Sequence, residues 1–295
     1  MKLKRMIAAA AAIALGTAGC ATIETPPADA ESGPALWEIS DEDTTIYLFG
    51  TVHALPRDTA WFSGKVERAF NASDEMVTEV DLGNPQESGQ ALANAAMLPE
   101  GCNLRQMMTP ENRMQFEEAL VALGLQVEAF DRVEPWFAAM TLSLLPVVQA
   151  GYDQQSGVEL SLSTRAGTKR RSALETIDQQ VDLFDKLPED AQLTFLDKVV
   201  EGIGEAKPTL DAMVAEWLAG DARELSVLLN SEMSDPKLYD RLLTQRNRNW
   251  ADWIERRMDE PGTVFLAVGA GHLAGKGSVQ DQLRKRGMKV RRIWR

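Results

Sequence analysis

The sequence predicts an α/β (α+β) protein with a mixed central sheet built from both chain ends and a largely helical middle section. Short apolar segments with strand character occur near both ends, at 35–50 and 263–294. In the middle, apolar residues recur with the spacing of amphipathic helices. After the N-terminal segment, no run approaches the roughly 18 unbroken apolar residues that a membrane helix needs.

The first elements of the domain are predicted to be a β-hairpin and a short helix. Residues 35–40 (ALWEIS) and 44–50 (TTIYLFG) flank the turn-forming Asp41-Glu42-Asp43. The helix is expected over about Gly64 to Ala72. A strand with the sequence EMVTEVDL, residues 75–82, is expected to follow it.

The middle of the chain is predicted to be mostly helical. Thr109-Pro110 supplies an N-cap and a first helical residue, and apolar residues keep helical spacing as far as Gly124. A second apolar stripe runs from Leu210 to Leu218. A short strand is expected at Ser172 to Glu175, and the stripes are expected to face the core.

The C-terminal part is predicted to contain a strand, a helix and a final strand. These are expected at Thr263–Val268, about Gly275–Arg286 and Met288–Trp294. A strand, helix and strand of these lengths predict a right-handed parallel crossover.

The N-terminus indicates export. Residues 1–19 combine early basic residues with a short apolar run, as in a signal peptide. The stretch that ends at Cys20 resembles a bacterial lipobox, and cleavage near Ala21 without a lipid is the alternative. Residues 20–34 are predicted to be a flexible tether, and residues 35–295 a single domain. We therefore expect a periplasmic protein that a lipid on Cys20 anchors to the cell envelope of a Gram-negative bacterium.

The net charge restricts the classes of binding partner, and the cysteine content restricts what can stabilise the fold. The formal net charge is −13, and loss of the basic signal peptide makes it more negative. Such a surface argues against binding to nucleic acid or anionic lipid. If Cys20 carries a lipid, Cys102 has no partner for an intrachain disulfide, so a hydrophobic core must hold the fold.

The only two histidines in the sequence occur in the same setting. His53 follows Gly50, and His272 follows Gly269, each as Gly-x-x-His after an apolar run. Glycine lets the backbone turn sharply and approach a ligand closely. Because ligands of open α/β sheets bind beyond the carboxyl ends of strands, the two turns are expected to lie at one site.

Carboxylates on the strand at 75–82 complete this candidate site. Glu79 and Asp81 are alternate residues, so they are expected to point the same way. Two imidazoles with one or two carboxylates form the smallest common ligand set for a catalytic transition metal. Such a metal lowers the pKa of its bound water and polarises a carbonyl group. The alternative is that the histidines are structural and the carboxylates form salt bridges or face solvent.

Other motifs carry less weight. The glycine-rich stretch 269–274 fits a loose dinucleotide pattern, but no acidic residue follows at the required distance. The sequence has no Gly-x-Ser-x-Gly motif of a serine hydrolase. Several arginines lie on the helix predicted around 242–258, and one or two of them are expected to reach the site, because arginine suits bidentate contact with carboxylate.

Four segments together resemble the TraB/GumN family, which is related to the Tiki proteins: TIYLFGTVHALP, EMVTEVDL, LLTQRNRNWADWI and VFLAVGAGHLAG. Tiki members are regarded as metalloproteases that use manganese or cobalt. The resemblance therefore implies a metal-dependent, hydrolase-like site at His53, Glu79 and His272. The further positions that it assigns are Arg246, Asn247, Gly157–Glu159 and Glu175.

The leading hypothesis is a metal-dependent hydrolase of the cell envelope that acts on a peptide or small molecule, with a peptidase as the more specific expectation. His53, Glu79 and His272 would bind a divalent transition metal (Mn, Co or Zn), and Arg246 would orient the substrate. The supporting residues would be Gly50, Asp81, Glu175, Asn247 and Gly269. The alternative is a non-catalytic periplasmic lipoprotein that binds a peptide, a metal or haem. A third reading is a purely structural envelope protein.

Overall fold

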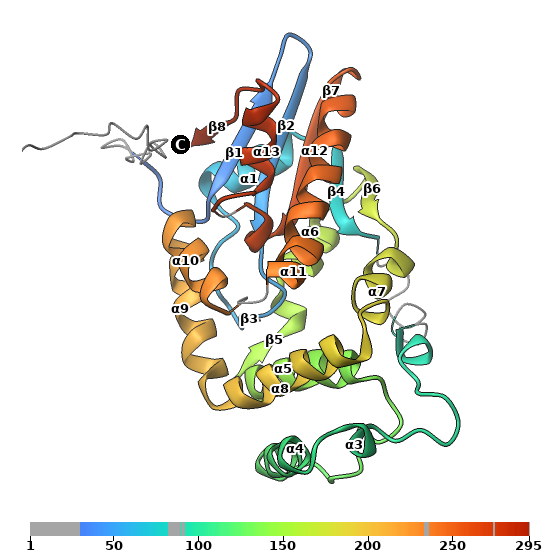
Figure 1. The fold of residues 1–295 in the computed structure, drawn as a ribbon. Coiled ribbons are helices and arrows are strands. Elements are labelled where there is room, and N and C mark those ends of the chain that lie inside the picture. The colour runs from blue at the N-terminus through green and yellow to red at the C-terminus, as the bar shows by residue number, and fades with distance from the viewer. Residues whose placement is uncertain (1–29, 82–88, 90–91, 233–235, 274, 295) are drawn as a thin grey trace, which may run out of the picture.

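The computed structural model describes residues 30–295 except 82–88, 90–91, 233–235, 274 and 295. The predicted signal peptide and Cys20 lie outside the described residues. Six strands form a mixed sheet in the order β6-β4-β7-β2-β1-β8 (Figure 1). Their bounds are β1 Leu36–Ser40, β2 Thr44–Thr51, β4 Glu75–Val80, β6 Arg170–Glu175, β7 Gly262–Gly269 and β8 Arg291–Ile293. The predicted fold class, a mixed sheet with a helical middle, is confirmed.

The centre of the sheet joins the two ends of the chain. Strands β1 and β2 form the predicted antiparallel hairpin, with Leu36 opposite Phe49. Strand β2 then pairs in parallel with β7, from Thr44 opposite Gly262 to Thr51 opposite Gly269. Strand β4 is parallel to both β7 and β6. The carboxyl ends of β2, β7, β4 and β6 therefore lie at the same edge of the sheet.

Two helical layers cover the sheet because its residues alternate between two apolar faces. On β7, Leu266 belongs to the core beneath α12 (Gln245–Arg257) and α13 (Val279–Lys285). Its neighbour Phe265 belongs to the opposite core, beneath α1 (Gly64–Ala72) and α6 (Val158–Arg165). Figure 1 shows these helix pairs on opposite faces. Each fully buried residue of this size contributes about 1.5–3 kcal/mol relative to exposure.

The helical middle has a core of its own. Phe116 and Leu120 of α4 pack with Leu142 of α5 and Leu196 of α8. Thr109 accepts a hydrogen bond from the backbone N–H of Asn112, which confirms the predicted N-cap of α4. The helices of this part, including the three just named, and a small two-stranded sheet have the following bounds: α3 Leu104–Met107, α4 Pro110–Ala122, α5 Pro135–Gln149, α7 Ile177–Asp185, α8 Glu189–Gly202, α9 Ala206–Ala219, α10 Ala222–Glu232, α11 Pro236–Tyr239, β3 Leu55–Pro56 and β5 Tyr152–Asp153.

The C-terminal elements differ in detail from the prediction. A 3₁₀ turn at Ala270–Leu273 follows β7, and α13 begins only at Val279. The delay has a local cause: Gly275 and Gly277 have φ angles of 72° and 80°, which no right-handed helix accommodates. Strand β8 is parallel to β7, as predicted, but β2 and β1 lie between them, because β8 pairs with β1.

The segment before the hairpin already contacts the domain. The backbone N–H of Glu31 donates to the carbonyl of Trp294 at 2.6 Å, and its carboxylate pairs with Arg68 at 2.9 Å. The stretch predicted as a tether up to Pro34 is thus attached to the domain from Glu31 onward. Among the described residues, no helix combines the length and the apolar character needed to cross a membrane.

Candidate functional site

The candidate site lies at the carboxyl ends of three neighbouring strands. His53 comes two residues after β2, His272 lies in the 3₁₀ turn after β7, and Glu79 is the penultimate residue of β4. Because Thr51 is opposite Gly269 in the parallel pair, both Gly-x-x-His turns leave the sheet at one edge. The structure thus brings together segments from the two ends of the chain, as the sequence predicts.

His272 is buried and neutral. Asn247 donates through Nδ2 to the carbonyl of Gly277, so its Oδ1 accepts a hydrogen bond from His272 Nδ1 at 2.6 Å. Arg246 Nη1 lies 3.0 Å from His272 Nε2, and a guanidinium group has only donors. The ring is therefore protonated at Nδ1 and accepts at Nε2. Burial lowers the pKa of His272 to about 3.

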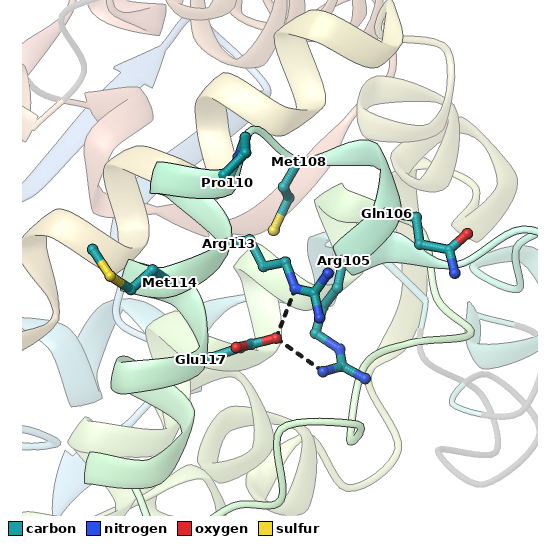
Figure 2. A pocket seen from close by; sticks show the side chains of 7 residues that line it. All are labelled: Arg105, Gln106, Met108, Pro110, Arg113, Met114 and Glu117. Atoms are coloured by element: carbon teal, nitrogen blue, oxygen red, sulfur yellow. Dashed lines mark hydrogen bonds and ion pairs between the residues drawn. The ribbon is translucent and has the colours of Figure 1, made fainter.

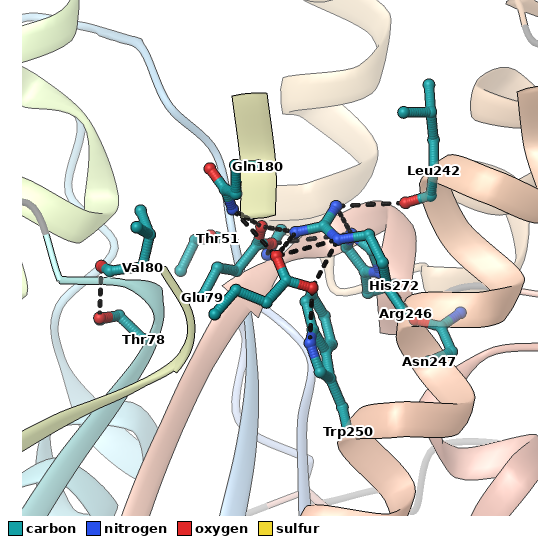
Figure 3. A network of polar contacts seen from close by, with 12 residues as sticks. Thr51, Thr78, Glu79, Val80, Gln180, Leu242, Arg246, Asn247, Trp250 and His272 are labelled. Atoms are coloured by element: carbon teal, nitrogen blue, oxygen red, sulfur yellow. Dashed lines mark hydrogen bonds and ion pairs between the residues drawn. The ribbon is translucent and has the colours of Figure 1, made fainter. Parts of the chain in front are cut away.

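Arg246 occupies the centre of the site, and each of its five N–H groups has an acceptor (Figure 3). Nε donates to Glu175 at 2.9 Å, and Nη2 donates to Glu175 at 2.8 Å and to Glu79 Oε2 at 2.5 Å. Nη1 donates to His272 Nε2 and to the carbonyl of Leu242, one turn earlier on the helix, at 3.2 Å. The side chain is only 11% exposed. Burial opposes the charge, but Glu175 and Glu79 raise the pKa of Arg246, so it remains a cation.

Trp250 closes one side of this group. Its ring lies 4.7 Å from the guanidinium carbon of Arg246 and 4.2 Å from the ring of His272. Its Nε1 donates to Glu175 Oε1 at 3.0 Å. A cation over an aromatic face is attracted by about 0.5–2 kcal/mol, depending on desolvation. Trp250 therefore fixes both the arginine and its main carboxylate partner.

Glu79 connects β4 to β7 and to Arg246. Its Oε1 accepts from the backbone N–H of Gly269 at 2.6 Å and lies 3.7 Å from His272 Nε2. Burial alone would raise the pKa of Glu79, but His272, Arg246 and the Gly269 N–H lower it to about 2. A Cβ on residue 269 would lie 3.0 Å from Glu79 Oε1, so glycine permits this close approach. Gly50 likewise permits a close approach of the chain, because a Cβ there would lie 3.1 Å from Cα of Ala270.

His53 has a different environment from His272. Its side chain is 75% exposed, and Nδ1 lies 2.8 Å from Glu159 Oε1 in the first turn of α6. Thr51 donates to the same carboxylate oxygen at 2.6 Å. Glu159 raises the pKa of His53 to about 9, with a smaller upward contribution from Glu79. The partner carboxylate of His53 is therefore Glu159.

Asp81 does not share the position of Glu79. Strand β4 ends at Val80, which is opposite Glu175 in the last pair with β6, so the alternation expected from the sequence stops before residue 81. Asp81 is exposed and, with Glu175, lines a shallow hollow of about 420 Å³. The hollow opens beside the Arg246 cluster.

The residues as placed do not fit a metal ion. Within the part of the chain that the structure describes, no three His, Cys, Asp or Glu side chains are grouped to hold one. The Nε2 atom of His272 already accepts from Arg246, and His53 is held at Glu159. The predicted ligands are of suitable chemical types, but Arg246 takes the place between His272 and Glu79.

Three contributors to the site were not predicted as such. Glu159 was assigned only by resemblance, and nothing in its local sequence indicates that it pairs with His53. Trp250 carried a usable signal, because it follows Arg246 by four residues on a predicted helix and so shares its face. Gln180, which donates to Glu79 and Glu175 at 3.3 Å, carried none.

A larger hollow, of about 530 Å³, lies on α3 and α4 (Figure 2). Arg105 and Arg113 both donate to Glu117 at 2.9 Å, and Arg105 also pairs with Asp131 at 2.6 Å. Its cations are thus balanced by neighbouring carboxylates. No candidate residue from the sequence lines it.

The fold and the site define an α/β protein with a histidine, glutamate and arginine cluster at the carboxyl ends of parallel strands. The chain belongs to the TraB/PrgY/gumN family, whose model matches residues 35–292. The uncharacterized protein YbaP of Escherichia coli is 26% identical over 240 residues, which cover 81% of this chain and 87% of YbaP. An uncharacterized protein of Treponema pallidum is 22% identical over 85% of this chain and 80% of its own length.

A human relative carries a functional name. The metalloprotease TIKI1 of Homo sapiens is 23% identical over 332 residues, which cover 93% of this chain and 65% of TIKI1. The relatives of this chain thus include a protein named as a metalloprotease, which extends beyond the matched region. No solved structure matches this chain.

Proposed function

We propose that this protein is a hydrolase in which His53, oriented by Glu159, protonates the leaving group of the bond that is hydrolysed. The observation that carries the proposal is the His53–Glu159 pair, with an exposed imidazole, at the strand ends that also hold the Arg246 cluster. A carboxylate on Nδ1 fixes the tautomer of the ring and stabilises its protonated form. The Nε2 edge is then free to act on a substrate.

The two histidines differ in the role that their environments permit. His53 is exposed, and its raised pKa makes it a proton donor at neutral pH, suited to protonating the leaving group of a hydrolysed bond. His272 is buried, uncharged and bonded at both nitrogens, so it serves to position Arg246. Glu175, which accepts from Arg246, lines the hollow near Asp81, where a substrate would lie.

We propose a peptide bond as the substrate. The support comes from the name metalloprotease that the TIKI relatives carry, and those relatives are 22–23% identical to this chain. The acidic surface favours substrates without a strong negative charge. For the location, we propose export and a lipid on Cys20, from the signal-like residues that precede it. Mass spectrometry of the mature N-terminus tests this, because unmodified Ala21 at the start would contradict the anchor.

The test of function is a hydrolysis assay with a library of fluorogenic peptides and esters. Each substrate is assayed with EDTA and with Mn²⁺, Co²⁺ or Zn²⁺, so that dependence on a divalent metal is measured together with activity. We expect His53→Ala to reduce kcat by about 10²–10⁴-fold, the usual contribution of general acid–base catalysis. The matched control is Arg57→Gln, because Arg57 lies just after β3, is 80% exposed and pairs with Asp153.

Two results would contradict the proposal. One is hydrolysis that persists unchanged in His53→Ala while the variant stays folded. The other is no hydrolysis of any substrate by the wild-type protein under any of the metal conditions, which would favour a binding function.

A further inference from the structure

We propose that Arg246 is the resident cation of this site, and that its guanidinium group competes with metal ions for His272 and Glu79. The arginine lies between the two groups that a metal would need. Nη1 is 3.0 Å from His272 Nε2, and Nη2 is 2.5 Å from Glu79 Oε2. The sequence presents these two residues as metal ligands, whereas the structure presents them as the acceptors of an arginine.

The competition follows from the number of lone pairs. The imidazole of His272 has one acceptor nitrogen, because Nδ1 carries the proton that it donates to Asn247. That single lone pair cannot hold a metal and accept from Arg246 at the same time. A metal on His272 therefore requires the Nη1 contact to break.

Electrostatics favour the arginine further. Glu79, Glu175 and Arg246 together carry one net negative charge, and the side chains of all three are 11–16% exposed. A divalent ion placed beside the guanidinium would meet a like charge in a poorly solvated site. Without the arginine, the same two carboxylates would present two negative charges and a free imidazole nitrogen.

The structure also shows what keeps Arg246 in place. Glu175 accepts from both Nε and Nη2, the carbonyl of Leu242 accepts from Nη1, and Trp250 covers the guanidinium. These contacts involve neither His272 nor Glu79. Removal of the arginine side chain frees His272 Nε2 and removes the cation from Glu79, which keeps its bonds to the Gly269 N–H and Gln180. Changes to surface arginines on α12 do neither.

The experiment measures Co²⁺ binding to the full-length protein by calorimetry and visible absorption. We expect Arg246→Met to bind Co²⁺ at least tenfold more tightly than wild type and to show the absorption of a histidine-bound ion. The double variant Arg246→Met/His272→Ala should lose that gain. The matched control is Arg248→Met on the same helix, because Arg248 is 47% exposed and should leave affinity unchanged.

Two further measurements guard against a misfolded variant. Circular dichroism checks the fold, and Arg246→Lys, which keeps the charge but has fewer donors, should bind Co²⁺ less tightly than Arg246→Met. In wild type without added metal, ¹⁵N NMR should show His272 protonated at Nδ1. The proposal is overturned if wild type binds Co²⁺ as tightly as Arg246→Met, or if His272 carries its proton on Nε2.

Discussion

Glu175→Gln tests whether the Arg246 cluster holds the sheet and helices together. The carboxylate of Glu175 accepts from Nε and Nη2 of Arg246 and from Nε1 of Trp250, and it is 11% exposed. Glutamine has nearly the same shape but keeps one acceptor oxygen and turns an NH₂ group toward other donors. Loss of one partner from a buried ion pair costs about 3–5 kcal/mol, and each hydrogen bond to a charged group contributes about 1.5–3 kcal/mol. Because one acceptor and the Arg246–Glu79 contact remain, we expect a loss of about 3 kcal/mol.

The assay is urea unfolding followed by far-UV circular dichroism. The control is Asp182→Asn on α7, because Asp182 is 44% exposed, and its ion pair with Lys186 should contribute less than about 1 kcal/mol. If Glu175→Gln lowered the free energy of unfolding no more than the control does, the cluster would not have the structural role that its contacts indicate.

Three further predictions concern two glycines and the two histidines. Gly157→Ala should destabilise the protein by about 2 kcal/mol or more, as overpacking does, because the added Cβ would lie 2.2 Å from the carbonyl oxygen of His53. Gly202→Ala, which has open space around it, should instead stabilise by about 0.4–1 kcal/mol. Equal melting temperatures for the two variants would contradict this. Stability should fall as the pH drops from 6.5 toward about 3, because the unfolded chain protonates His272 in this range while the folded chain keeps it neutral. The urea concentration at the unfolding midpoint should change less across that pH range in His272→Gln than in wild type. An unaltered pH dependence would refute the assignment of His272 as a neutral group in the folded protein. Glu159→Gln should move the NMR titration midpoint of His53 down from about 9 toward 6.5, and an unchanged midpoint would show that another group raises it.

The sequence predicted the sheet well because its signals are local. The hairpin has a turn between two apolar segments, and β7 is a continuous run of apolar residues, so each strand is recognisable by itself. Placement of both Gly-x-x-His turns at one edge then needed only the rule that ligands bind beyond strand ends. The structure agrees with that placement, since β2 and β7 pair in parallel.

The side-chain partners were harder to predict because they depend on packing between distant elements. His53 meets Glu159 only because α6 packs beside the end of β2, which no spacing in the sequence encodes. Asp81 was expected to lie beside Glu79, but the last pair between β4 and β6 comes one residue earlier. Whether Arg246 or a solvated neighbour enters the site likewise depends on how α12 is rotated against the sheet.

The position of β7 in the sheet has a consequence for biosynthesis. This strand lies between β4 and β2, yet it is synthesised long after both, so the middle of the sheet stays open until β7 has been made. Pairing over such long sequence separation is slow, because the intervening chain must be ordered first. A nascent or truncated chain that ends before Gly262 lacks both His272 and the backbone N–H that Glu79 binds. Any activity of this site would therefore arise only after β7 and the turn that follows it have been synthesised.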